Sequence, residues 1–188
     1  MSPIEFLHQR NSSPKLIDPA PSAAELEQMF QAAFRAPDHA RQRPWRFLTI
    51  QGESRHAFGE LMAEASALRD PSLGPDKLDK IKQKPLRAPL IVAAAVNYRH
   101  HPKVPEQEQL LAAGCAVMNL LNAVDALGYG AIWRTGANAF DPYVWRGLGF
   151  EANEELIGFI YIGSRYGESK PLPVLSSADF VRDWNPEI

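Results

Sequence analysis

The sequence predicts an α+β or α/β fold built on a central sheet of four or five strands. Segments of helical and strand character alternate along the 188 residues, without an internal repeat or a linker that divides the chain. Residues 89–96 form an almost continuous apolar run, which is typical of a strand covered on both faces. Residues 105–127 are apolar nearly all round, so this helix should lie centrally or at a subunit interface.

Local signals place the elements in the first half of the chain. Residues 3–9 can form a short amphipathic helix. The Ser22-x-x-Glu25 pattern is a capping box that starts a second helix, and the pair Ala36-Pro37 stops it. Residues 45–51 alternate as a strand does, whereas residues 54–68 carry apolar side chains at helical spacing.

Further signals place the elements of the second half. Helices are expected at residues 76–83, 105–127 and 142–147, and strands at residues 89–96, 129–133 and 156–163. Pro105 suits the first position of the long helix, and Gly128 can end it in a left-handed conformation. Asp141 before Pro142 caps the short helix. Residues 1–188 are therefore expected to form one domain, with residues 168–188 as a proline-rich C-terminal arm.

Composition excludes several classes of protein. The chain is 45% hydrophobic with a net charge of −2 and shows no basic stripe, which argues against a nucleic-acid partner. No window of 18 apolar residues lacks a charge, so no membrane span is expected. The single cysteine, Cys115, permits no intrachain disulfide and fits a cytoplasmic location; its apolar helix predicts a buried, inert thiol.

Three segments concentrate polar chemistry, and the first lies at residues 10–15. Arg10, Asn11, Ser12 and Ser13 follow the first helix, and Lys15 lies two residues beyond them. Guanidinium and hydroxyl groups are the donors that a phosphate needs. The alternative is a helix end with a favourable cation and a serine turn.

The second segment is the connection from Ala36 to Trp45. His39 can hydrogen-bond a ligand ring there, and Arg41 or Arg43 can meet a negative charge. The alternative is a histidine in a solvated loop. No set of residues has the spacing of a metal site, and no nucleophile motif or acid–base pair identifies a catalytic side chain.

The third segment is Trp133-Arg134-Thr135-Gly136, at the end of a predicted strand. A flat aromatic face, a guanidinium, a hydroxyl and an open backbone suit a planar, anionic cofactor. The alternative is structural: Arg134 pairs with an acidic side chain such as Asp141, and Trp133 fills a gap in the core.

The order of these motifs resembles the nitroreductase family, and most closely its compact bacterial NAD(P)H nitroreductases. The resemblance covers about residues 4–173. It rests on Arg10-x-Ser12, on Ala36-Pro37-Asp38-His39 followed by Pro44-Trp45, on the helix that contains Ala113-Gly114-Cys115-Ala116 and ends in Leu127-Gly128-Tyr129-Gly130, on Ile132-Trp133-Arg134-Thr135-Gly136, and on the strand Ile157-Gly158-Phe159-Ile160-Tyr161-Ile162-Gly163.

This resemblance implies an α+β, nitroreductase-like fold with a mostly antiparallel sheet, and a homodimer that holds FMN at the subunit interface. The residues that it places at the cofactor are Arg10, Asn11, Ser12, Arg35, His39, Trp133, Arg134 and Thr135. It also assigns residues 123–128 to NAD(P)H. The chain departs from the family at Asn11, where many members have arginine, and at Asp38, Arg41 and Arg43, where many have serine, asparagine and glutamine. Lys15, Arg41 or Lys170 can restore positive charge.

The resemblance implies an FMN-dependent oxidoreductase that passes electrons from NAD(P)H to a small acceptor such as a nitroaromatic or a quinone. Such chemistry resides in the flavin and requires no protein nucleophile or metal. A cation such as Arg134 or Arg41 would stabilise the reduced flavin. Two alternatives remain, a flavin-sequestering protein with little turnover and an interaction protein without a cofactor.

Overall fold

The computed structural model describes residues 1–186, so the last two residues of the expected arm lie outside the described part. The helices are α1 (Pro3–Gln9), α2 (Ala23–Ala33), α3 (Ser54–Arg69), α4 (Pro75–Lys82), α5 (Glu106–Ala126) and α6 (Pro142–Gly147). Short 3-10 turns are η1 (His39–Arg41), η2 (Lys84–Arg87), η3 (Ala137–Phe140) and η4 (Ser177–Asp179). The strands are β1 (Leu16–Ile17), β2 (Trp45–Gln51), β3 (Leu90–Asn97), β4 (Gly130–Arg134) and β5 (Glu154–Arg165).

The five strands form one sheet in which every pair is antiparallel. β5 has the most partners, because it pairs with β3, β4 and β1. β3 in turn pairs with β2. β3 is buried along its whole length, as its apolar run predicts. The predicted α+β class with four or five strands is therefore confirmed. The sequence signals did not reveal the two-residue strand β1, and β5 extends two residues beyond its predicted bounds at each end.

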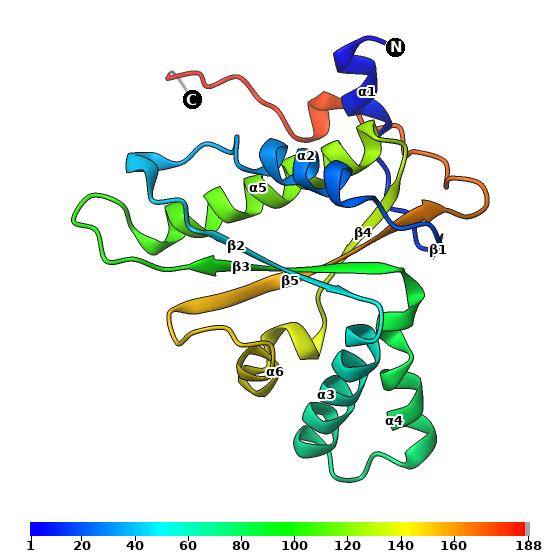
Figure 1. The fold of residues 1–188 in the computed structure, drawn as a ribbon. Coiled ribbons are helices and arrows are strands. Elements are labelled where there is room, and N and C mark those ends of the chain that lie inside the picture. The colour runs from blue at the N-terminus through cyan, green and yellow to red at the C-terminus, as the bar shows by residue number, and fades with distance from the viewer. Residues whose placement is uncertain (187–188) are drawn as a thin grey trace.

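Helices cover both faces of the sheet (Figure 1). α2 and α5 pack on one face, where Met29, Val117 and Leu120 are fully buried. α3 and α6 pack on the other, where the tilted rings of Phe58 and Phe159 lie with their centroids 5.0 Å apart. Apolar burial on both faces supplies the driving force that holds the layers together.

The predicted helix ends are confirmed at three positions. The Ser22 hydroxyl accepts from the Glu25 backbone N–H, and the Glu25 carboxylate accepts from the Ser22 backbone, which completes the capping box. Gly128 has φ +86° after α5. The Asp141 carboxylate accepts from the Tyr143 backbone N–H at the start of α6. Pro105, expected as the first helical residue, is instead the N-cap of α5.

The prediction that the Cys115 thiol is buried is wrong, because Cys115 is exposed. The buried side of α5 consists of Gln109, Ala112, Ala113, Ala116, Val117, Leu120, Leu121 and Val124. Cys115 lies on the opposite side, together with Leu111 (60% exposed) and Met118 (41% exposed). Because α5 is apolar on nearly all sides, the side that does not face the sheet exposes apolar residues to solvent. By length and hydropathy alone α5 could also cross a membrane, a test that a core helix passes as well.

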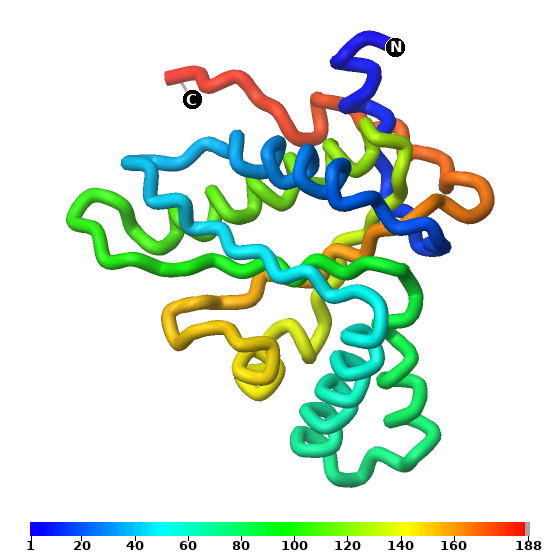
Figure 2. The backbone as a smooth tube through the Cα atoms, viewed as in Figure 1, coloured from blue at the N-terminus to red at the C-terminus, as the bar shows by residue number. Residues whose placement is uncertain are grey.

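The segment after β5 has little regular structure. Residues 166–186 are exposed and contain only the 3-10 turn η4 within the described part of the chain. In Figure 2 the segment leaves β5, passes near α1 and runs along the outer side of the α2–α5 layer. Two hydrogen bonds tie its beginning to the N-terminal segment: the Tyr166 backbone N–H donates to the Lys15 carbonyl at 3.4 Å, and the Asn11 side-chain amide donates to the Lys170 carbonyl at 2.7 Å.

Candidate functional site

The structure brings the first and third polar segments together. The Ser13 backbone N–H donates to the Ala131 carbonyl in β4 at 2.8 Å. A Cβ on Gly130 would collide with Ser13, at 2.8 Å from its side chain, so this close approach depends on glycine. Arg134 lies three residues beyond Ala131, or about 10 Å along the strand. The segments at 10–13 and 133–136 therefore border one stretch of β4.

Cations surround the first segment. Ser12, Ser13 and Lys15 line a cavity of about 190 Å³ with Arg165 and Lys170. An adjoining cavity of about 330 Å³ includes Asn11 and Asp125. Asp125 neutralises Arg165 through an ion pair. Arg10 is half-buried and, among the described residues, makes no ion pair. Hydroxyls beside unpaired cations are the donors that a phosphate requires.

A β-bulge positions Trp133. The register between β3 and β5 shifts after Ala94 pairs with Gly158, so that Ala95 faces Leu156 and Ile157 is left over. The freed Ile157 carbonyl accepts from the Trp133 indole N–H at 3.2 Å. The ring lies so close to Gly158 that a Cβ there would come within 2.1 Å of the indole nitrogen. Trp133 remains 37% exposed, so it is fixed in place but does not fill the core.

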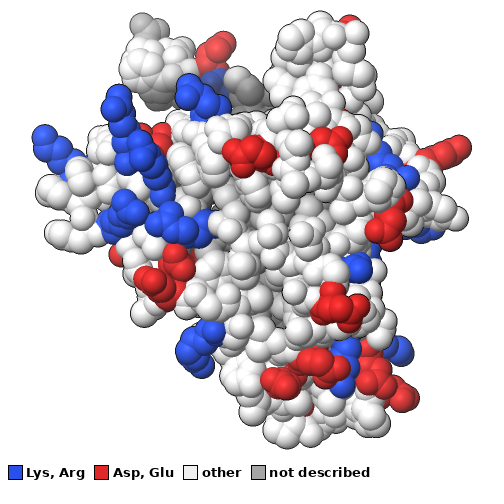
Figure 3. Space-filling view, viewed as in Figure 1, with Lys and Arg blue, Asp and Glu red and all other residues white. Residues whose placement is uncertain are grey.

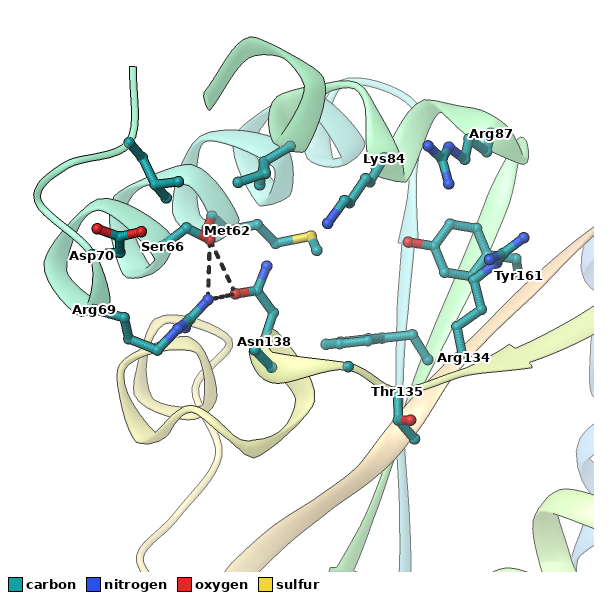
Figure 4. A pocket seen from close by; sticks show the side chains of 15 residues that line it. Met62, Ser66, Arg69, Asp70, Lys84, Arg87, Arg134, Thr135, Asn138 and Tyr161 are labelled. Carbon is teal, nitrogen blue, oxygen red and sulfur yellow. Dashed lines mark hydrogen bonds between the residues drawn. The ribbon is translucent and has the colours of Figure 1, made fainter. Parts of the chain in front are cut away.

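Arg134 points to the other face of the sheet, into a cavity of about 640 Å³ (Figure 4). Its guanidinium carbon lies 5.8 Å from the centre of the Tyr161 ring. Its Nε is buried and has no hydrogen-bond partner among the described residues. The predicted alternative, a pair between Arg134 and Asp141, is wrong because Asp141 pairs with Arg69. An orphaned, charged N–H in a cavity is costly unless a ligand accepts from it.

The rest of this cavity mixes cations with apolar walls. Lys84 and Arg87 from η2 stand across it from Arg134 and near Tyr161 (Figure 4). Burial raises the pKa of the Tyr161 hydroxyl, and the charges of Arg134 and Arg87 oppose that shift. The phenol is therefore neutral near pH 7 and can donate a hydrogen bond. Lys84 and Arg87 were not among the predicted site residues, although two cations shortly before a fully buried strand are a usable signal.

A hydrogen-bonded network holds the wall of the cavity. Arg69 at the end of α3 donates to the Asp141 carboxylate, to the Asn138 amide oxygen at 2.5 Å and to the Ser66 hydroxyl at 3.0 Å. Asp141, Asn138 and Ser66 are all buried. The network joins α3 to the loop that follows Gly136. It thereby fixes the backbone next to Arg134 and Thr135, which also line the cavity.

The second segment lies far from the first in the single chain. The His39 Nδ1 is 2.7 Å from the Glu108 Oε2 in the first turn of α5, and Arg35 is exposed nearby. Asp125, beside the first segment, lies 17 residues further along α5, or about 25 Å at 1.5 Å per residue. Within one chain the first segment therefore lies near the C-terminal end of α5, whereas His39 lies near its N-terminal end (Figure 1).

The loop around His39 has an unusual backbone. Ala40, Arg41 and Arg43 have φ of +56°, +54° and +49°, in a region that non-glycine residues rarely adopt. The Asp38 carboxylate accepts from the backbone N–H groups of Gln42 (3.0 Å) and Arg43 (2.7 Å), which stabilises the loop. Lys and Arg side chains gather in Figure 3 over the side where η1 and β2 lie. Strain of this kind clusters at functional sites, which favours a ligand contact over a passive solvated loop.

Only part of the segment expected to meet NAD(P)H is accessible. Val124 is buried and Asp125 is paired with Arg165. Ala126 and Gly128 are the exposed positions of residues 123–128. Among the described residues, no group of three or more His, Cys, Asp or Glu side chains could hold a metal ion.

The layered antiparallel sheet, with a cationic cavity beside its fourth strand, has the fold of the nitroreductases. A structure of a nitroreductase-like family protein from Bacillus cereus superimposes with a TM-score of 0.84 at 17% identity, covering 98% of this chain and 96% of that one. A structure described as a "putative nitroreductase in complex with fmn", from Desulfovibrio desulfuricans, gives a TM-score of 0.75 at 20% identity, covering 99% of both chains.

Sequence comparison agrees with the fold. The model of the nitroreductase family matches residues 7–164, and the chain belongs to this family. The protein described as "Putative NAD(P)H nitroreductase YdjA" of Escherichia coli is 37% identical over 166 residues, which cover 87% of this chain and 88% of that protein. The resemblance found in the motifs is thereby confirmed.

Proposed function

We propose that this chain is an FMN-dependent oxidoreductase that passes electrons from NAD(P)H to a small acceptor such as a nitroaromatic or a quinone. The family match and the description of the Escherichia coli relative support the reaction class. The description of the Desulfovibrio structure supports the cofactor. The observation that carries the proposal is that the first segment is hydrogen-bonded to β4 at Ala131, about 10 Å along the strand from an arginine whose buried Nε has no partner.

In this proposal the first segment holds the FMN phosphate and ribityl chain. Arg10 and Ser12 supply a guanidinium and a hydroxyl, and Lys15 and Lys170 add charge where many family members have a second arginine. The Asn11 amide is engaged with the Lys170 carbonyl. Asn11 would therefore act by holding the Lys170 segment over the phosphate.

The third segment would hold the flavin ring. Bound FMN would supply hydride and electron transfer. The Arg134 guanidinium would stabilise the negative charge of the reduced cofactor. Trp133 and Thr135 flank Arg134, and a Cβ on Gly136 would meet nothing within 4 Å, so a ligand can approach its backbone N–H.

A homodimer is part of the same proposal, because the second segment is remote from the first within one chain. Arg35 and His39 would contact the FMN held by the other subunit. Nε2 of the His39 ring would make this contact with FMN, because Nδ1 faces Glu108. The exposed apolar side of α5 at Leu111, Cys115 and Met118 supplies a surface that a second copy can bury. An exposed free thiol also suits a reducing, cytoplasmic location.

The visible spectrum of the purified protein tests the cofactor directly. We expect a yellow protein that releases FMN on heating and whose flavin is bleached by NADH or NADPH in stopped flow. Arg10→Ala should lose a charge-assisted contact of ~1.5–3 kcal/mol, or about ten- to hundredfold in FMN affinity. Arg146→Ala, at an exposed arginine on α6, is the matched control. Unchanged affinity in Arg10→Ala would remove Arg10 from the site.

Two further results separate the alternatives. A flavin that binds tightly but is not reduced by either nucleotide indicates a flavin-sequestering protein. A colourless protein without affinity for added FMN indicates an interaction protein.

The oligomeric state is tested separately. Leu111→Arg should give a species of about 21 kDa in light scattering, and native Cys115 should resist modification by maleimide until the protein is denatured. A wild-type monomer that still holds FMN would contradict the dimeric site.

A further inference from the structure

We propose that the cavity beside Arg134 selects electron acceptors that carry a negative charge on an aromatic ring, such as aromatic carboxylates. This inference names the acceptor class and rests on the proposed oxidoreductase function. It concerns the cavity of about 640 Å³ between α3, η2, η3 and β5, here called the Arg134 cavity. None of its lining residues lines the cavities at Ser12–Lys15.

The charge of the Arg134 cavity is unbalanced. Lys84, Arg87 and Arg134 all line it, and none of them forms an ion pair with a described residue. Arg69 is the fourth cation, and Asp141 neutralises it. The one carboxylate in the lining, Asp70, accepts from the Ser72 hydroxyl at 2.6 Å and from the Ser72 backbone at 3.0 Å. Three cations facing one rim carboxylate favour an anionic ligand.

The geometry favours a carboxylate over a monatomic anion. Arg134 is assigned to the flavin in the proposed function, which leaves Arg87 as the guanidinium for the acceptor; a guanidinium binds the two oxygens of a carboxylate through parallel N–H donors. Arg87 and Lys84 approach from the other side of Tyr161, whose hydroxyl points into the same space (Figure 4). The Lys84 ammonium and the Tyr161 hydroxyl thus face the same part of the cavity, with Arg87 beside them (Figure 4).

The remaining walls favour a flat apolar body. Met62 and Phe159 are almost fully buried beneath the cavity, and Leu73 and Ile81 line its side. Concave sites that combine apolar walls with a few convergent polar groups are typical of small-molecule pockets. An aromatic ring can lie against these walls while its anionic substituent meets the cations. A neutral aromatic of the same shape would leave the cations unpaired.

A matched pair of acceptors tests the inference. 4-Nitrobenzoate and 4-nitrobenzamide have nearly the same shape and differ in charge. With the FMN-loaded enzyme and NAD(P)H, we expect kcat/KM for 4-nitrobenzoate to exceed that for 4-nitrobenzamide by about tenfold or more, which corresponds to about 1.4 kcal/mol. Arg87→Gln should reduce this ratio to near one. Lys80→Gln, at an exposed lysine of α4 outside the cavity lining, should keep it.

A binding measurement judges the inference independently of turnover. Calorimetric titration of the same two compounds into the protein as purified should show the same preference, weakened by 0.5 M salt and lost in Arg87→Gln. Equal affinity and equal kcat/KM for the two compounds would overturn the inference and leave the proposed function standing. Loss of FMN from Arg87→Gln with an unchanged acceptor ratio would overturn it as well, because Arg87 would then serve the cofactor. Turnover of neither compound would contradict the proposed function, whereas the titration would still decide the anion preference.

Discussion

Replacement of Arg69 by alanine should destabilise the fold and loosen the wall of the Arg134 cavity. The Arg69 guanidinium donates to three buried groups, on Ser66, Asn138 and Asp141. Its own side chain is 36% exposed, whereas that of Asp141 is 9% exposed. Removing Arg69 leaves a carboxylate and an amide oxygen in a poorly solvated place without their main donor.

The size of the effect follows from this partial burial. Breaking a fully buried pair costs about 3–5 kcal/mol, and an exposed pair contributes about 0–1 kcal/mol. With one partner one-third exposed, we expect Arg69→Ala to lower the free energy of unfolding by roughly 2–3 kcal/mol. For a chain of this length each kcal/mol lowers Tm by about 2–4 °C, so the midpoint should fall by roughly 4–12 °C.

Thermal unfolding followed by circular dichroism measures this change, and a double-mutant cycle assigns it. Asp141→Asn and the double variant should show that the two effects are not additive, since the residues share one interaction. The control is Lys82→Ala, which removes the more exposed ion pair with Glu60 and should shift the midpoint far less. An Arg69→Ala protein that melts within about 1 °C of wild type, or additive effects in the cycle, would refute the reasoning.

Two other substitutions probe the fold. Gly158→Ala should displace the Trp133 indole, because the new Cβ would lie 2.1 Å from its nitrogen. We expect the free energy of unfolding in urea to fall by about 1–3 kcal/mol and the tryptophan fluorescence to change. A variant with unchanged stability and fluorescence would argue against the close fit. Glu25→Gln should make the free energy of unfolding depend less on pH in the acidic range. Hydrogen bonds from the Ser22 hydroxyl, the Ser22 backbone and Tyr129 lower the pKa of Glu25 below 4.5, so its contribution is present above that pH and is lost as pH falls through the lowered value. Urea midpoints of the two proteins between pH 6 and 3 measure this, and parallel curves would contradict it.

Patterns that depend on neighbouring residues predicted the fold well. The capping box at Ser22 and Glu25, the left-handed Gly128 and the buried run of β3 each reflect local backbone chemistry or simple burial. The two-residue strand β1 carries too little sequence to show a period. The bulge at Ile157 could not be foreseen, since it follows from the register of β3 against β5.

Pairing between distant residues limited prediction of the site. The sequence offered an acidic side chain such as Asp141 as a partner for Arg134. The fold instead brings Arg69 from α3 to Asp141 and leaves Arg134 facing the cavity with Lys84 and Arg87. Cys115 was misplaced for a related reason. An apolar helix does not reveal which side faces the sheet until α2 and the strands are in place.

The register of β4 decides which side chain serves which face of the sheet. Ala131 belongs to the core beneath α2 and α5, and Ile132 packs against the opposite core. Trp133 and Arg134 continue this alternation, so adjacent residues face opposite sides. A slip of one residue would exchange them and turn the guanidinium out of its cavity. The pairing of Gly130 through Arg134 with β5 and the fit of Trp133 over Gly158 both oppose such a slip, so the bulge that looks like a local irregularity also secures Arg134.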